Sequence, residues 1–144
     1  MKRSDALAEL SRDHHQGLVV AQRLNRATGD SAAAAREVFL RFWDDEGHQH
    51  FRIEEDVLLP AIAHRVAPTH EAVVRVLTEH VDIRRRAADV AADPHAGVAQ
   101  LNELGARLRD HIRHEEQALF PLIEQALTDD ELAELLEALE RAEE

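Results

Sequence analysis

Two copies of one histidine–glutamate motif constrain the fold of this 144-residue chain more than any other feature of its sequence. The segments His50–Pro60 and His111–Pro121 share the pattern H-x-R-x-E-E-x-x-L-x-P and start 61 residues apart. An acidic residue and a histidine precede each copy, as Asp13-His14 and Glu79-His80. Each half of the chain therefore holds a segment with one histidine, followed by a segment with HxxxE. Two such halves packed together would have approximate two-fold symmetry, with a symmetric site at their junction.

The remaining sequence is typical of long helices. Ala, Leu, Glu and Arg dominate, glycine and proline are few, and no segment reads as a strand. Capping residues, glycine and proline divide the chain into five predicted helices, at about 4–28, 31–65, 69–92, 93–127 and 128–143. We expect Gly29 at the C′ position of the first helix, a kink or local break at Pro60, and a capping box from Thr128 to Glu131.

Short connections between long helices make neighbouring helices antiparallel. The sequence therefore predicts an all-α fold: an up-down antiparallel four-helix bundle with a short fifth C-terminal helix. By its length the chain is one domain, 1–144, with the bundle at about 4–127 and an amphipathic C-terminal helix at about 128–143.

Composition excludes several classes of function. A formal net charge of -12 argues against a nucleic-acid or anionic-membrane partner, because both require a basic face. The absence of cysteine excludes disulfides, thiolate metal sites and iron–sulfur clusters. The N-terminal residues lead into an amphipathic segment, with neither a signal peptide nor a transmembrane stretch, so we expect a cytoplasmic protein.

One histidine interrupts the apolar stripe of each of the four long helices. These histidines are His14, His50, His80 and His111. The stripe of the second helix is expected to continue to Val57, and that of the fourth to Ala118 and Leu122. In both HxxxE motifs, the histidine and the glutamate lie one turn apart on the same face, which turns Glu54 and Glu115 inward as well.

A single histidine on an apolar face is usually a core residue with a hydrogen-bond partner. Four of them together with two carboxylates would be costly to bury unless a cation lay between them. A metal ion supplies that charge, since it binds neutral imidazole and carboxylate directly. These donors suit iron, manganese, zinc or copper. Two bridging carboxylates with two histidines at either end describe a dinuclear site, and the Glu-x-x-His motif of ferritin-like bundles is absent.

The order H…HxxxE…H…HxxxE, with its E-E-x-x-L-x-P endings, resembles the hemerythrin-like (HHE cation-binding) domain family over about residues 4–125. The resemblance implies a non-haem centre of two iron ions, oxo- or hydroxo-bridged, with manganese and zinc ranking behind iron. It implies that His14 and His50 bind one iron, that His80 and His111 bind the other, and that Glu54 and Glu115 bridge them. It also implies that the centre binds or reacts with a small oxidant: dioxygen, peroxide or nitric oxide.

The sequence departs from the oxygen-carrying members of that family in one respect. Those proteins carry two histidines on the third helix at i, i+4, whereas His80 here has Val76 before it and Arg84 after it at that spacing. Without the fifth histidine the centre would be more symmetric and more open. We therefore expect peroxide chemistry, nitric oxide chemistry or iron handling rather than oxygen storage.

Two further residues could belong to the site. Glu46 stands one turn before His50 on the same stripe and is either an extra ligand, a residue that holds a ligand imidazole, or an ordinary salt-bridged glutamate. His15 follows His14 but points about 100° away on a helix, so it is expected at the surface or just outside the ligands. The glutamates after the two bridging positions, Glu55 and Glu116, are expected to pair with nearby arginines.

Other functions compete with the di-iron interpretation. An iron store or donor that repairs damaged iron centres would hold labile metal. A metal-free helical phosphotransfer or interaction module would need an exposed histidine, often beside a lysine, and the only lysine is Lys2. A purely structural zinc bundle is a third alternative. The sequence does not separate an enzyme from a sensor or carrier, and it names no protein partner.

Overall fold

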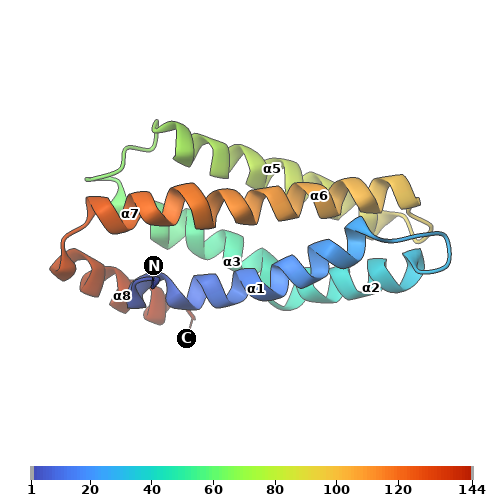
Figure 1. Cartoon of the computed structure of the whole chain (residues 1–144), viewed down its shortest axis with the longest axis horizontal. Coiled ribbons are helices and arrows are strands. Elements are labelled where there is room, and N and C mark those ends of the chain that lie inside the picture. The colour runs from blue at the N-terminus through green and yellow to red at the C-terminus, as the bar shows by residue number, and fades with distance from the viewer. Residues whose placement is uncertain (1, 144) are drawn as a thin grey trace.

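Four long helices run up and down beside one another and form an antiparallel bundle (Figure 1). The computed structural model describes residues 2–143. The first helix is α1 (Asp5–Asn25) and the third is α5 (Glu71–Ala92). The short helix α8 (Asp129–Glu143) folds back and packs against α1 near the two chain termini. The predicted all-α bundle with a fifth C-terminal helix is confirmed for the described residues.

The second and fourth long helices are not regular α-helices. The second consists of α2 (Ala32–Phe42), the π-helical turn η1 (Trp43–Gly47), α3 (His48–Ile53), the π-helical turn η2 (Glu54–Leu58) and α4 (Leu59–Ile62). The fourth consists of α6 (Val98–His114), the π-helical turn η3 (Glu115–Leu119) and α7 (Phe120–Ala126). Such turns contain one extra residue and are frequent at functional sites.

Two of the π-helical turns start at the motif glutamates and end just before the motif prolines. The N–H of Leu59 bonds to the carbonyl of Glu54, and the N–H of Phe120 bonds to that of Glu115. The wider turns lead into Pro60 and Pro121, which lack an N–H and occupy the first turn of α4 and α7. The helix therefore continues through Pro60, and the expected break is replaced by a π-helical turn.

The extra residue changes which side chains face the core. The stripes were expected to pass through Val57 and Ala118, but Val57 is only partly buried and Ala118 is exposed. Leu58 and Leu119, one position later, are fully buried instead. A strict helical period fails here because each π-helical turn shifts every later side chain by one residue.

Two predicted helix boundaries are also wrong. Helix α1 ends at Asn25 with Arg26 as its C-cap, and no described glycine has a positive φ, so Gly29 is not the C′ residue of this helix. Helix α6 begins at Val98 rather than near Asp93. The capping box of the last helix is confirmed: the Thr128 N–H donates to the Glu131 carboxylate, and the Glu131 N–H donates to the Thr128 hydroxyl.

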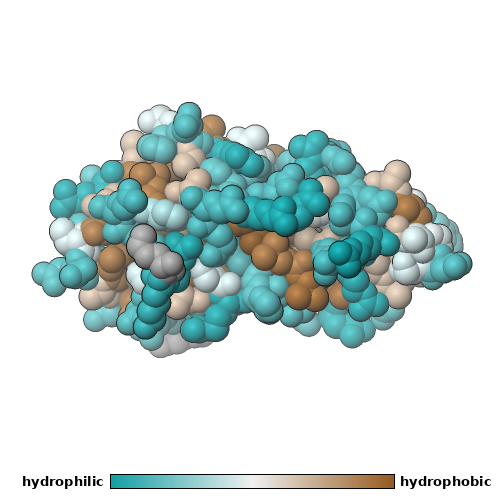
Figure 2. Space-filling view, viewed as in Figure 1, coloured by the Kyte–Doolittle hydropathy of each residue, from teal (hydrophilic) through white to brown (hydrophobic). Residues whose placement is uncertain are grey.

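The apolar core forms two clusters, one toward each end of the bundle. One contains Leu7, Leu119 and Leu135 of α8, and the other contains Leu24 and Ile83. Along α1 and α5, His14 and His80 lie between the residues of the two clusters. Phe51 and Ile112 of the second cluster directly follow His50 and His111. The viewed surface in Figure 2 is largely hydrophilic, with an apolar patch over its middle. None of the helices among residues 2–143 is long and apolar enough to cross a membrane.

Candidate metal centre

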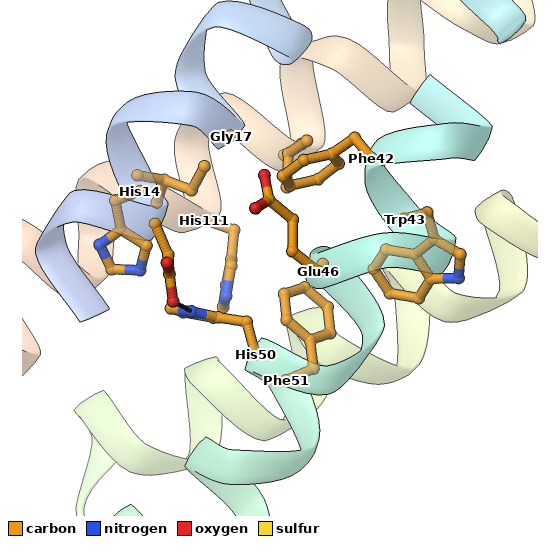
Figure 3. A pocket seen from close by; sticks show the side chains of 12 residues that line it. His14, Gly17, Phe42, Trp43, Glu46, His50, Phe51 and His111 are labelled. Atoms are coloured by element: carbon orange, nitrogen blue, oxygen red, sulfur yellow. Dashed lines mark hydrogen bonds and ion pairs between the residues drawn. The ribbon is translucent and has the colours of Figure 1, made fainter. Parts of the chain in front are cut away.

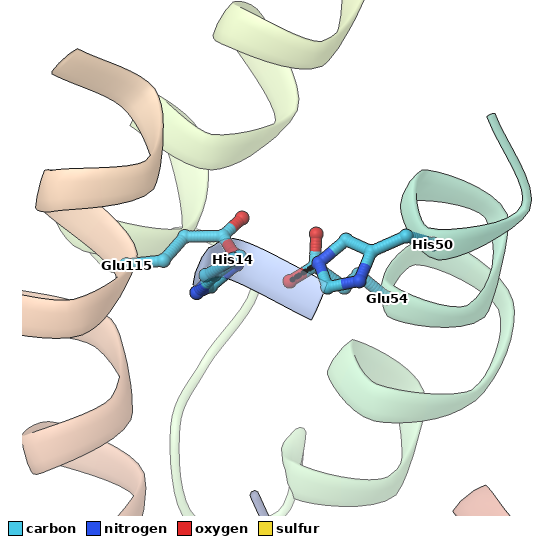
Figure 4. A group of neighbouring side chains, drawn as sticks. All are labelled: His14, His50, Glu54 and Glu115. Carbon is cyan, nitrogen blue, oxygen red and sulfur yellow. Dashed lines mark hydrogen bonds and ion pairs between the residues drawn. The ribbon is translucent and has the colours of Figure 1, made fainter. Parts of the chain in front are cut away.

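The bundle brings all six proposed ligands together in its interior. His50 is 8% exposed, and the other five residues, His14, Glu54, His80, His111 and Glu115, are between 0 and 4% exposed. Each of the four long helices contributes one histidine, and η2 and η3 contribute the glutamates. Figure 4 shows the side chains of His14, His50, Glu54 and Glu115 pointing toward one another. Such a concentration of buried ionisable groups requires compensating charge.

The six residues form two groups of four that share both glutamates. One group is His14, His50, Glu54 and Glu115, and the other is Glu54, His80, His111 and Glu115. Within each group one donor atom per residue lies within 4.8 Å of every other. The grouping matches the approximate two-fold symmetry of the repeated motif. It gives each half of the centre two imidazoles and two carboxylate oxygens.

The inward nitrogens face the two shared glutamates. His14 Nε2 lies 2.8 Å from Glu115 Oε1, and His111 Nε2 lies 2.9 Å from Glu115 Oε2. His50 Nε2 and His80 Nε2 lie 3.2 and 3.1 Å from the two oxygens of Glu54. Despite these approaches, several buried donor atoms have no well-formed hydrogen bond, among them three of the Nε2 atoms and both Glu54 oxygens. Unsatisfied nitrogen and oxygen atoms converging on one point fit a cation between them.

Each histidine is held from outside by a further carboxylate on its Nδ1 atom. Asp13 lies 3.1 Å from His50 Nδ1, and Glu79 lies 2.9 Å from His111 Nδ1. In these two pairs the acid comes from the preceding helix of the same half. A carboxylate on Nδ1 fixes the ring orientation and leaves Nε2 free to bind a metal.

The other two outer carboxylates cross between the halves. Glu116 lies 2.6 Å from His14 Nδ1, and Glu55 lies 2.6 Å from His80 Nδ1. Both glutamates also pair with arginines, as expected from the sequence: Glu116 with Arg3, and Glu55 with Arg84. Their contact with the histidines was not predicted. The signal was present in the sequence, since the second glutamate of E-E and the acid before each histidine recur in both halves.

The carboxylates raise the pKa of the buried imidazoles. Burial alone would lower the pKa of His14, but its hydrogen bonds with Glu115 and Glu116 outweigh that effect and raise the pKa to about 9. Burial would also lower the pKa of His111. The interactions of His111 with Glu115 and Glu79 outweigh burial and raise this pKa to about 10. The pKa values of His50 and His80 are also raised. Metal ions and protons must therefore compete for the same nitrogens.

The two additional sequence candidates lie outside the groups of ligands. His15 is exposed and lines a groove between α1 and α6. Glu46 is partly buried in η1 and lines a small cavity beside His14, His50 and His111. Figure 3 shows its side chain extending from η1 between these histidines and the ring of Phe42. The structure thus keeps Glu46 near the centre without placing it among the converging donor atoms.

That cavity adjoins the centre. It offers about 20 Å³ to the centres of water-sized molecules, and about 10–15 Å³ suffices for one water. Apart from the histidines, Glu46 and Asp13, its walls are apolar or glycine: Gly17, Phe42, Trp43, Gly47, Phe51, Leu108 and Ile112. The cavity therefore has room for one water-sized molecule beside His14 and His50.

Fold and site together define a helical bundle with a buried histidine–carboxylate cluster that fits a metal site. The family model described as hemerythrin HHE cation binding domain matches residues 5–123 of the chain. The match covers most of the sequence, and the chain belongs to this family. Neither the comparison with curated proteins nor that with solved structures gave a significant match.

Proposed function

We propose that the chain is a non-haem di-iron protein that binds or reacts with a small oxidant: dioxygen, peroxide or nitric oxide. The observation that carries the proposal is the pair of four-residue groups sharing Glu54 and Glu115. A single metal would need only one of these groups. Two groups with shared carboxylates are the arrangement of donors expected for two bridged ions. Imidazole and carboxylate without thiolate favour iron over softer metals, and the cysteine-free sequence is compatible with a cytoplasmic location.

The chain's own residues would bind, orient and shield the metals. His14 and His50 would hold one ion, and His80 and His111 the other. The four Nδ1–H groups would donate to the outer carboxylates of Asp13, Glu116, Glu55 and Glu79. Bound iron would supply the change of oxidation state that binding or reducing an oxidant requires. The apolar clusters on both sides exclude bulk water, and the cavity beside His50 admits a small molecule.

Burial separates this proposal from two alternatives. An iron donor requires metal that leaves easily, whereas the six proposed ligands are at most 8% exposed and four of them are fixed by outer carboxylates. A phosphotransfer module requires an accessible histidine, and the four repeated histidines are buried. Slow loss of iron to a modest chelator would support the proposal against the donor alternative.

Metal analysis of protein purified without chelators, together with an absorption spectrum of the same sample, tests the proposal. We expect about two iron ions per chain and charge-transfer bands in the near ultraviolet. Both should be lost in His50→Ala and Glu115→Ala and kept in the matched control His48→Ala, whose histidine is exposed on the same helix. A His15→Ala variant should also keep its metal. Protein without metal that takes up no ferrous iron under anaerobic conditions would contradict the proposal.

A further inference from the structure

The two ends of the metal centre are not equivalent, although the motif is repeated. Gly17 lies three residues after His14, and the matching position after His80 is Ile83, which is buried. Gly47 lies three residues before His50, and the matching position before His111 is Leu108. At both positions, the first half has a glycine where the second half has a large apolar side chain. The cavity lies at the end with the glycines.

Both glycines are needed for space rather than for backbone conformation. A Cβ atom on Gly17 would lie 2.7 Å from Ile112 Cδ1, and one on Gly47 would lie 2.9 Å from Phe42 Cε2. Neither has a positive φ. The absence of a side chain at Gly17 lets Ile112 approach its helix, and the absence of one at Gly47 does the same for Phe42. A side chain at either position would displace that wall residue of the cavity.

The same end carries a carboxylate without a counterpart. Glu46 lies four residues before His50, whereas the matching position before His111 is Arg107, which is half exposed and bonds to Glu103. The π-helical turn η1 that contains Glu46 also lacks a counterpart, since α6 is regular through Arg107. The segment around Glu46 thus differs from its counterpart around Arg107 in sequence and in helix geometry, and the cavity lies beside this segment.

Two carboxylates line the cavity, those of Asp13 and Glu46. Asp13 bonds to His50. Glu46 has no salt bridge or side-chain hydrogen bond among the described residues. It is partly buried in a wall that is apolar or glycine apart from Asp13 and the three histidines. Its nearest charged neighbours along the helix, Asp44 and Asp45, are also acidic. Any molecule in the cavity therefore meets, beside the three histidines, a carboxylate with no ion-pair partner among the described residues.

We propose that Glu46 restricts the cavity to uncharged small molecules and rejects small anions. The inference rests on the proposed function and defines the class of ligand that reaches the centre. A carboxylate repels an anion over several ångströms when the space between them is apolar, because little water screens the interaction. An uncharged molecule such as nitric oxide or dioxygen is not affected by this repulsion. Glu46 acts here as a specificity-determining residue and not as a metal ligand.

Binding of one anion and one neutral molecule to wild type and Glu46→Gln tests this inference. Glutamine keeps the shape of the side chain and removes only its charge. Sodium azide would be titrated into the oxidised, iron-loaded protein, and nitric oxide into the reduced protein, both followed by absorption. The control is Glu37→Gln, which removes a glutamate on the same long helix whose side chain is 72% exposed and paired with Arg41. Metal content would be measured for every variant.

We expect Glu46→Gln to bind azide about tenfold more tightly, since Glu46 is partly screened by solvent. Nitric oxide affinity and metal content should stay at the wild-type level, and Glu37→Gln should resemble wild type throughout. An unchanged azide affinity, or an equal change for azide and nitric oxide, would overturn the inference. Loss of iron in Glu46→Gln would also overturn it, by identifying Glu46 as a ligand. If wild type itself binds no metal, the proposed function fails instead.

Discussion

Loading the centre with metal should release protons, because the metal-free protein keeps its histidines protonated. The pKa values of about 9 for His14 and about 10 for His111 mean that both rings carry two protons at pH 7. Each ring must lose the proton on Nε2 before that nitrogen can bind a metal. The Nδ1 atom keeps its proton and donates it in a hydrogen bond to Glu116 or Glu79. Metal affinity should therefore rise with pH.

The size of the effect follows from these two pKa values. At pH 7, deprotonation costs roughly 3 kcal/mol at His14 and roughly 4 kcal/mol at His111, at ~1.4 kcal/mol per pH unit. At least two protons should leave as the metals bind, and the raised pKa values of His50 and His80 can only add to this number. Because both rings are still protonated at pH 8, the apparent affinity for each ion should increase about tenfold from pH 7 to pH 8. The overall constant for binding both ions should increase about 100-fold.

Anaerobic calorimetric titration with ferrous iron at pH 7, in buffers of different ionisation enthalpy, counts the released protons directly. Competition with a chelator of known pH dependence gives the affinity at pH 7 and at pH 8. A His14→Ala variant is the matched control and should release about one proton fewer. Release of less than one proton from wild type, or an affinity change below about tenfold per pH unit, would refute this account of the histidine charges.

Three further predictions concern stability and orientation. The raised histidine pKa values stabilise the metal-free fold fully below pH 6.5, the approximate histidine pKa in the unfolded chain, and this stability is lost as the pH rises through about 9 and 10. Denaturation of metal-free protein at several pH values should show this decline. A free energy of unfolding that increases from pH 8 to pH 10 would contradict it. Glu79→Gln should weaken metal binding about 10–100-fold by loosening His111; chelator competition measures this, and the exposed Glu103→Gln should match wild type. Gly105→Ala places a Cβ 2.6 Å from backbone atoms of α1 and should lower the free energy of unfolding by about 1–3 kcal/mol. The control Gly97→Ala, with nothing within 4 Å of the added Cβ, should lower it little. Equal losses of stability in urea denaturation would contradict the packing argument.

The helices and the position of the centre could be predicted because both depend on periodicity. Each histidine interrupts an apolar stripe, and a polar residue on such a stripe must face the interior. His14 and His80 lie in regular helices, where the period holds along the whole element. Their burial follows from sequence spacing alone. The ligand assignment itself stays a prediction until metal is measured.

The π-helical turns could not be predicted, because a periodic stripe assumes a constant number of residues per turn. The error appears only after Glu54 and Glu115, where Leu58 and Leu119 replace the expected core positions. The proline that follows each motif was the only local sign. Such a proline predicts a kink or local break, because an isolated proline removes one helical hydrogen bond.

The crossed contacts of the outer carboxylates were missed for a different reason. Glu116 and His14 are separated by 102 positions in the sequence, and only the packing of the two halves brings them together. Neighbouring arginines gave a simpler explanation for the same charges. The cavity at Glu46 also required the structure, because its walls come from three different helices.

The division of the apolar core into two clusters has a consequence for hydrogen exchange. The two clusters are separated by the layer of histidines and carboxylates, so they are joined mainly by the helices that pass through it. Without metal, no bound cation holds Glu54, Glu115 and the four histidines together in this layer. Local opening should then begin in η2 and η3, and amides on the two sides should exchange as separate units. With metal bound, the same amides should open together, because the centre joins all four long helices at one level.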